Sequence, residues 1–148
     1  MRTTVRNTIL ADITELERVA DESGLSPWTR QGYLDEIERP DSIFLTIETD
    51  DRGISGFFVG HIVAGPDAEI YNIAVTKKAR RHGLGQSLLT EFVSQCRNKG
   101  VGNIWLEVRQ SNLNAINFYK GSDYAEISVR PSFYNNPVED AVIMKLKI

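Results

Sequence analysis

The chain has 148 residues, of which 41% are hydrophobic and 25% are charged, and we expect residues 1–148 to form a single globular domain. Seventeen Lys and Arg residues against twenty Asp and Glu residues give a net charge of −3, without the basic excess of most nucleic-acid-binding domains. Because the sequence shows neither a secretory signal nor an apolar run of the roughly 20 residues that span a bilayer, we expect a cytoplasmic protein that binds no membrane.

The first half of the chain predicts a strand, two helices and three more strands. Residues Thr3 to Arg6 suit an edge strand, and the Asp12-x-x-Glu15 spacing is typical of a helix start, with Gly24 as its stop. A second helix is expected over Thr29 to Glu38, since Pro40 cannot donate the next backbone hydrogen bond. The turn signals that follow indicate an antiparallel meander of strands at Ser42 to Thr49, Gly53 to Val63 and Glu69 to Val75.

The second half alternates between helices and strands. Apolar residues recur at steps of three and four from Leu84 to Cys96, which predicts an amphipathic helix that ends near Gly100 and buries Cys96. The elements expected after it are a strand over Asn103 to Arg109, a short helix from a cap at Ser111 or Asn112 to Tyr119, and strands at Tyr124 to Arg130 and Asp140 to Lys147. The predicted fold class is therefore α+β, because the sheet is too antiparallel for a doubly wound fold.

A basic turn lies between the strand that ends at Val75 and the helix that begins near Leu84. It reads Arg80-Arg81-His82-Gly83-Leu84-Gly85. Glycine lets the backbone approach a ligand closely, and the free N–H groups and dipole of a helix start favour an anion. The turn therefore suits a phosphate group, although a solvated turn with two glycines would show the same Gly-x-Gly.

Two nucleotide-binding motifs fail at this turn. A P-loop requires Lys and then Ser or Thr after its last glycine, whereas Gln86 and Ser87 follow Gly85. The dinucleotide-binding fingerprint has a third glycine where this chain has Leu88. Only about forty residues remain after Glu107, which is too few for the second half of such a fold.

The turn matches the Arg/Gln-x-x-Gly-x-Gly/Ala signature of the GNAT N-acetyltransferases, and the preceding Tyr71-Asn72-Ile73-Ala74-Val75 resembles that family's coenzyme-A strand. Other segments resemble the RimI-type ribosomal-protein alanine N-acetyltransferases: Ser26-Pro27-Trp28-Thr29, Trp105-Leu106-Glu107-Val108-Arg109, Ser111-Asn112 and Asn117-Phe118-Tyr119. The order of elements agrees over nearly the whole chain. The resemblance implies the GNAT fold, a mixed and mostly antiparallel sheet with helices on both faces.

The resemblance also implies that acetyl-CoA is the acetyl donor. Backbone groups of Ile73, Ala74 and Val75 are expected to bind its pantetheine arm, near Asn112, which also suits a helix cap. The residues expected to wrap its pyrophosphate are Arg80, Arg81, His82, Gly83, Leu84, Gly85 and Gln86. We predict no metal site, because His61 and His82 lack Cys or carboxylate neighbours at the spacing of metal ligands.

Two residues resemble the catalytic residues of the family. Glu107 resembles the general base, which takes a proton from an acceptor amine whose pKa lies near 8. Tyr119 resembles the general acid, which protonates the departing coenzyme-A thiolate. An alternating strand would equally turn Glu107 toward solvent, and Tyr119 would equally suit the core.

The acceptor implied by the resemblance is a protein N-terminus, namely the N-terminal alanine of a small-subunit ribosomal protein, acetylated by direct transfer in a ternary complex. Residues expected to line its entrance are Trp28, Tyr33, Phe133 and Tyr134. A GNAT enzyme that acts on lysine side chains or small amines is an alternative, and a non-catalytic CoA-binding module is a second. The presence of both Glu107 and Tyr119 argues against the module.

Two positions depart from the family pattern. Asp123 stands where a glycine usually follows the short helix, and we expect it to adopt the left-handed conformation that Asp tolerates. Pro131 stands where a polar residue often precedes the aromatic pair. It bears on the acceptor loop and leaves the predicted acetyl-CoA site untouched.

Overall fold

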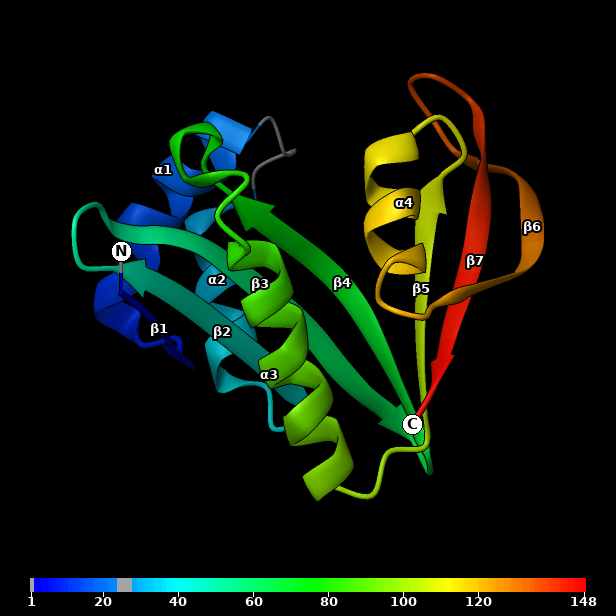
Figure 1. Ribbon diagram of the computed structural model, residues 1–148, viewed down its shortest axis with the longest axis horizontal. Helices are drawn as coiled ribbons and strands as arrows, with labels where there is room; N and C mark the ends of the chain where they lie inside the picture. Colours follow the sequence, from blue (N-terminus) through cyan, green and yellow to red (C-terminus); the bar gives the residue numbers. More distant parts are fainter. Residues whose placement is uncertain (1, 24–27) are drawn as a thin grey trace.

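The computed structural model describes residues 2–23 and 28–148, and within them seven strands form one sheet (Figure 1). The strands are β1 (Thr3–Asn7), β2 (Ser42–Thr49), β3 (Gly53–Ala64), β4 (Asp67–Val75), β5 (Asn103–Arg109), β6 (Ala125–Tyr134) and β7 (Glu139–Lys147). Their order across the sheet is β1-β2-β3-β4-β5-β7-β6, and every neighbouring pair is antiparallel except β4 and β5. The predicted α+β fold with a mixed, mostly antiparallel sheet is confirmed.

Helices cover both faces of the sheet. The helices are α1 (Ile13–Ser23), α2 (Arg30–Glu38), α3 (Leu84–Asn98) and α4 (Leu113–Lys120), with short 3-10 turns at Leu10–Asp12 and Lys77–Ala79. Helices α1 and α2 pack on one face, while α3 and α4 pack on the other (Figure 1). None of the helices in the described ranges is long and apolar enough to cross a membrane.

The sheet separates two cores because successive side chains of a strand point to opposite faces. On β2, Ile43 and Leu45 pack against α3, whereas Phe44 lies between them in sequence and packs against α1 and α2. The α3 face also buries Phe92 and Cys96, as predicted for the apolar stripe of that helix. Each face of the sheet therefore carries its own apolar cluster, and the helices are held by burial of these side chains.

The start of α1 differs from the prediction. The Asp12 carboxylate does not form the expected capping box with Glu15; it accepts a 2.8 Å hydrogen bond from the backbone N–H of Ile9 and pairs with Arg6 at 2.8 Å. This ion pair holds the pKa of Asp12 below its usual value. The Asp12 carboxylate therefore binds Arg6 of β1 instead of capping α1. The spacing of residues near Asp12 cannot predict this contact with another element. The predicted stop at Gly24 and the motif residues Ser26 and Pro27 lie outside the described residues.

Strands β4 and β5 separate soon after they begin to pair. Their parallel register runs from Asp67 opposite Asn103 to Glu69 opposite Trp105, and beyond it the strands diverge (Figure 1). The register between β3 and β4 shifts at the same level of the sheet and leaves Tyr71 without a partner in β3. The edge of β4 that faces β5 is consequently free of strand pairing over residues 70–75. We call this opening the splay.

Strand β6 extends beyond its predicted end at Arg130. Its register with β7 breaks between Arg130 and Tyr134, where Pro131 cannot donate a backbone hydrogen bond and Ser132 has a φ of 51°. Asp123, just before this strand, has a φ of 72°, so the predicted left-handed conformation is confirmed. The strand that carries the predicted acceptor aromatics is thus irregular beside Pro131.

Candidate functional site

Two cavities lie beside the splay, and they share no lining residue. The first, which we call the donor cavity, measures about 510 Å³ and lies between β4, α3 and α4. The second, the acceptor cavity, measures about 320 Å³ and lies on the face to which Trp105 and Glu107 point. On β5 these two residues alternate with Leu106 and Val108, which are buried on the α3 face. The diverging strands therefore separate two chemically different spaces.

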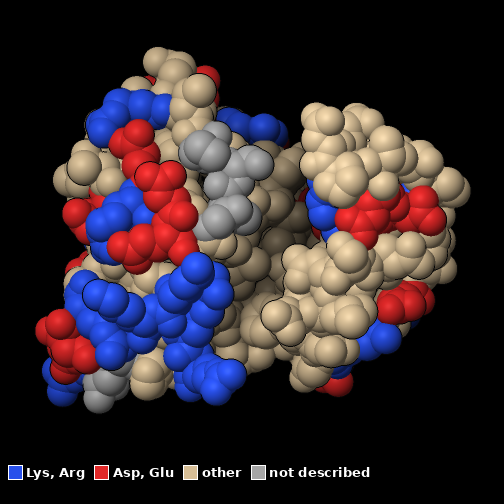
Figure 2. All heavy atoms as spheres, turned by 90° about the horizontal axis from the view of Figure 1, so that it is seen from above, with Lys and Arg blue, Asp and Glu red and all other residues tan. Residues whose placement is uncertain are grey.

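The donor cavity collects residues that are far apart in the sequence. Its lining residues are Ser23, Ile73, Ala74, Val75, Arg80, Gly85, Asn112, Asn114, Ala115, Phe118 and Tyr119. All three predicted residues of β4 are among them. A view onto this end of the molecule shows the groove between the two halves of the sheet, with Lys and Arg side chains gathered on one rim (Figure 2). The structure thus brings a strand edge without a strand partner, a helix start and the α4 residues to one space.

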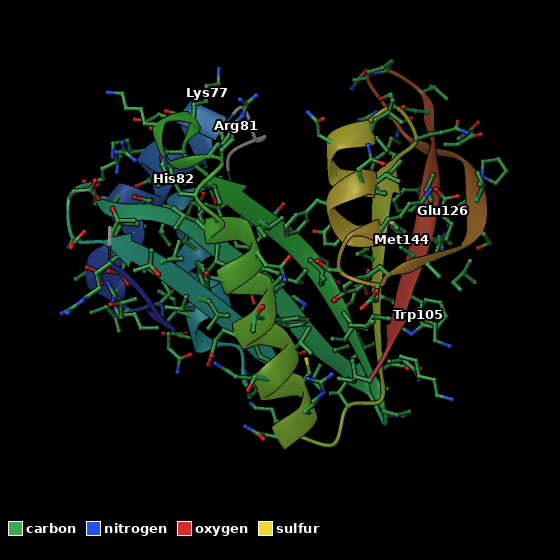
Figure 3. All side chains as sticks on the ribbon, in the orientation of Figure 1. Lys77, Arg81, His82, Trp105, Glu126 and Met144 are labelled. Atoms are coloured by element: carbon green, nitrogen blue, oxygen red, sulfur yellow. The ribbon has the colours of Figure 1, made fainter. Side chains whose placement is uncertain are left out.

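The basic turn has the backbone of an anion site. Gly83 is the N-cap of α3, with a φ of 74° and no side-chain cap, and Arg81 has a φ of 67°. No side chain of the N-cap residue therefore accepts a hydrogen bond from the N–H groups of the first helical turn, and these groups can donate to a phosphate. Lys77, Arg81 and His82 stand together at this end of the molecule (Figure 3).

The side chains of three residues predicted to bind the donor make contacts within the protein. The Leu84 side chain is buried in the core, so only its backbone faces the turn. The Gln86 side chain accepts a 2.9 Å hydrogen bond from the Ser122 hydroxyl and so ties α3 to the turn after α4. Arg80 donates from Nε to the Val75 carbonyl at 3.4 Å, which joins the turn to the end of β4.

Helix α4 brings two further predicted residues to the donor cavity. Asn112 caps the helix, as its Oδ1 accepts a 3.2 Å hydrogen bond from the Ala115 N–H, and it also lines the cavity. Tyr119 lines the same cavity, although its side chain is only 4% exposed. Burial raises the pKa of Tyr119 well above its ordinary value. The phenol therefore keeps its proton across the physiological pH range.

The acceptor cavity is lined by one guanidinium and by three carboxylates, of which that of Asp67 accepts hydrogen bonds from Asn103 and Trp105. Glu107 and Glu69 both line it, together with Arg130, whose Nη1 lies 3.3 Å from Glu107 Oε1. Burial raises the pKa of Glu69, and the negative charge of Glu107 raises it further. Neither Glu69 nor Arg130 was predicted as a site residue from the sequence, yet both share the cavity of the predicted base.

The four predicted acceptor aromatics have different positions. Trp28 is half-buried, with its ring 5.2 Å from that of Tyr33. Tyr33 is only 1% exposed and belongs to the core beneath α1 and α2. Its position does not support the predicted contact with an acceptor, because its ring packs between Trp28 and Phe44 and leaves no free surface.

The aromatic pair of β6 contacts two arginines, of which only Arg130 lines the acceptor cavity. The guanidinium of Arg109 stacks on Tyr134 at 4.5 Å, and that of Arg130 stacks on Phe133 at 4.9 Å. Burial raises the pKa of Tyr134, and the charge of Glu107 adds to the shift. Neither aromatic lines the acceptor cavity, so contact of Phe133 and Tyr134 with an acceptor stays a prediction.

A buried polar pair that the sequence did not predict holds α2 on the sheet. Nε2 of His61 lies 2.7 Å from Oε2 of Glu36, and both side chains are almost fully buried. The His61 ring also stacks on Tyr71, at 4.2 Å between centroids. Because Tyr71 is two residues from Glu69, this pair fixes the wall of the sheet next to the acceptor cavity.

Known proteins resemble this chain over most of its length. The profile of the acetyltransferase (GNAT) family matches residues 10–124. The chain is similar to the ribosomal protein bS18-alanine N-acetyltransferase of Salmonella typhimurium, with 35% identity over 125 residues, 82% of each chain. Two crystal structures are also similar. That of the ribosomal-protein-S18-alanine N-acetyltransferase from Escherichia coli has a TM-score of 0.87 at 26% identity and covers 99% of this chain and 94% of the other. That of Ard1 from Thermoplasma volcanium has a TM-score of 0.89 at 30% identity and covers 100% and 99%.

Proposed function

Because the chain belongs to the acetyltransferase (GNAT) family, we propose that it transfers the acetyl group of acetyl-CoA to the N-terminal alanine of ribosomal protein bS18. Residues 1–148 act as one catalytic domain in this proposal, and a ribosomal substrate sets the reaction in the cytoplasm. The relatives named for this activity, at 35% and 26% identity, support the choice of acceptor.

The positions of Glu107 and Tyr119 support the proposal more than any other feature. Glu107 lines the acceptor cavity and Tyr119 lines the donor cavity, and the splay lies between the two strands that bound these spaces. A base that deprotonates an amine and an acid that meets a leaving thiolate are needed on opposite sides of the reacting carbonyl. The separation of the two cavities matches this requirement.

The donor cavity offers the groups that acetyl-CoA requires. The edge of β4 over residues 73–75 has backbone N–H and C=O groups free of strand partners, which can bind the amides of the pantetheine arm as an added strand would. The start of α3 and the cations Lys77, Lys78, Arg80 and Arg81 suit the pyrophosphate. These residues therefore offer the donor free backbone hydrogen-bonding groups and positive charge.

The chemistry that we assign to these residues is direct transfer. Glu107 accepts a proton from the acceptor amine, directly or through one water, as the nitrogen forms its bond to the acetyl carbon. A backbone N–H at the free edge of β4 stabilises the oxygen of the tetrahedral intermediate. The C–S bond then breaks, and the Tyr119 hydroxyl donates to the departing sulfur.

Acetyl transfer to a panel of short peptides tests the proposed acceptor. We expect the highest kcat/KM for a peptide that begins with the alanine terminus of bS18, and no turnover when that terminus is blocked. A preference for blocked peptides that carry a free lysine, or for small polyamines, would replace the proposed acceptor. Lysine has a pKa near 10.4 and asks more of the base. Tight acetyl-CoA binding with no turnover on any acceptor would indicate a CoA-binding module.

The left-handed conformation of Gly83 should matter for binding of the donor. An alanine at this φ costs about 1–2 kcal/mol, and the turn relieves the strain by leaving the conformation that binds the pyrophosphate. We expect Gly83→Ala to raise the KM for acetyl-CoA about fivefold, measured by steady-state kinetics at saturating acceptor.

Gly65 provides the matched control for this prediction. It also has a positive φ, of 55°, and an added Cβ would meet nothing within 4 Å at either glycine. Gly65 lies in the turn between β3 and β4, outside both cavities. The Gly65→Ala variant should therefore keep the wild-type KM, and an equal rise in both variants would point to a general loss of folding.

A further inference from the structure

Arg130 reaches the acceptor cavity from β6 across an intervening strand. Strand β7 lies between β5 and β6, yet Nη1 of Arg130 lies 3.3 Å from Oε1 of Glu107 on β5. Both β5 and β6 are already paired to β7 by backbone hydrogen bonds. The ion pair is therefore not needed to hold the sheet together, and a half-exposed pair contributes little to stability.

The side chain of Arg130 is more exposed to solvent than that of Glu107. It is 53% exposed, whereas the Glu107 side chain is 23% exposed. Its guanidinium also lies over the Phe133 ring at 4.9 Å, a contact that can keep the side chain in place once Glu107 is released. Because the register of β6 with β7 breaks after Arg130, backbone pairing does not restrain the strand on that side.

The acceptor must bring a cation to the same carboxylate. An α-amino group with a pKa near 8 arrives mostly as an ammonium ion at neutral pH. A guanidinium at the contact distance of Glu107 repels a second cation there and fills the position from which a proton would pass to the carboxylate. Of the other two carboxylates of the cavity, Asp67 accepts hydrogen bonds from Asn103 and Trp105, and Glu69 has no hydrogen bond or ion pair to Arg130 among the described contacts.

We propose that Arg130 is a specificity-determining residue whose guanidinium occupies the place of the acceptor ammonium beside Glu107, and that the acceptor must displace it. This inference rests on the proposed function, in which Glu107 receives the proton of an N-terminal amine. If the acceptor must displace Arg130, it binds well only when it carries a cation that can take the place of the guanidinium beside Glu107. A ligand without such a group leaves the arginine in place and the base covered.

Replacement of Arg130 by an uncharged residue of similar length tests the proposal. In Arg130→Met the place beside Glu107 is open, so we expect the KM for the alanine peptide to fall about two- to fivefold while kcat stays within about twofold. Arg130→Lys keeps a cation at the position and should keep the KM near that of the wild type. The measurement is steady-state kinetics at saturating acetyl-CoA.

Lys120, at the end of α4, provides a matched control. It is 52% exposed and pairs with Glu126 of β6 at 3.1 Å, outside both cavities. Glu126 lies on β6 in Figure 3. Lys120→Met removes a comparable surface ion pair and should leave the KM for the peptide unchanged. A fall in KM in this variant as well would reflect overall charge instead of the place beside Glu107.

The outcomes separate this inference from the proposed function. A higher KM in Arg130→Met would indicate that Arg130 binds the acceptor. An unchanged KM would show that the Arg130–Glu107 ion pair does not compete with the acceptor. Either result overturns the inference. If the wild type acetylates no peptide, the proposed function fails, and calorimetric titration of the same peptide into the CoA-loaded protein still tests Arg130. Tighter binding by Arg130→Met supports displacement, whereas equal, weaker or absent binding overturns it.

Discussion

Glu107→Gln should lower kcat/KM for the alanine peptide by at least about 10²-fold at neutral pH, because a positioned general base contributes about 10²–10⁴ in rate. Glutamine keeps the shape of the side chain and its place in the acceptor cavity, but it cannot accept a proton. Affinity for acetyl-CoA should stay within about twofold, since Glu107 lines the acceptor cavity and not the donor cavity.

The size of this defect should depend on pH in a defined direction. Below the amine pKa of about 8 the acceptor is mostly an ammonium ion, so transfer requires a group that removes a proton. Above that pKa the free amine predominates and the need for the base falls. The ratio of wild-type to Glu107→Gln kcat/KM should therefore be largest near pH 6 and shrink toward pH 10, as measured on one peptide across that range.

Two other carboxylates serve as comparisons for this experiment. Glu69 lines the same cavity and has a raised pKa, so Glu69→Gln asks whether it is the base. Glu126 pairs with Lys120 outside both cavities, and Glu126→Gln should retain wild-type turnover. A larger loss in Glu69→Gln than in Glu107→Gln would move the base to Glu69. A ratio that stays constant across pH would remove Glu107 from the role.

The predicted elements and their local signals agree well with the structure. Asn112, one of the two expected caps, does cap α4, because a cap depends on residues that are neighbours in the sequence. Thr29, expected as the first residue of the second helix, is the N-cap of α2. Asp123 adopts the predicted left-handed conformation for the same reason. Of the predicted donor residues, Ile73 to Val75, Arg80 and Gly85 line one cavity, because only a short turn connects β4 to α3 and keeps them near each other.

What the sequence did not predict depends on contacts between distant segments. Glu69 reads as an ordinary surface residue until β4 pairs with β5, which sets it opposite Trp105 and near Glu107. Arg130 meets Glu107 by reaching across β7, a contact without a local pattern. Tyr33 was predicted to line the acceptor entrance, but an aromatic residue on a helix packs equally well into a core. Its burial is decided by Trp28 and Phe44 from other elements.

Tyr119→Phe should lower kcat about 10²-fold and leave the KM for acetyl-CoA within about twofold, because the phenylalanine fills the same space but cannot donate to the departing sulfur. Burial raises the pKa of Tyr119, so its proton is present from neutral pH up to at least the ordinary tyrosine pKa of about 10. The wild-type rate should accordingly show no loss from ionisation of Tyr119 over that range. Steady-state kinetics from pH 6 to 10 measures both effects.

Tyr124 makes the comparison specific to the position of the hydroxyl. Its ring lies 5.5 Å from that of Tyr119, burial likewise raises its pKa, and its hydroxyl has no hydrogen-bond partner among the described residues. Tyr124→Phe therefore removes a comparably buried hydroxyl that does not line the donor cavity, and it should retain wild-type turnover. If the two variants lose activity equally, the loss comes from packing of the α4 region. If neither does, the proton for the thiolate comes from another group.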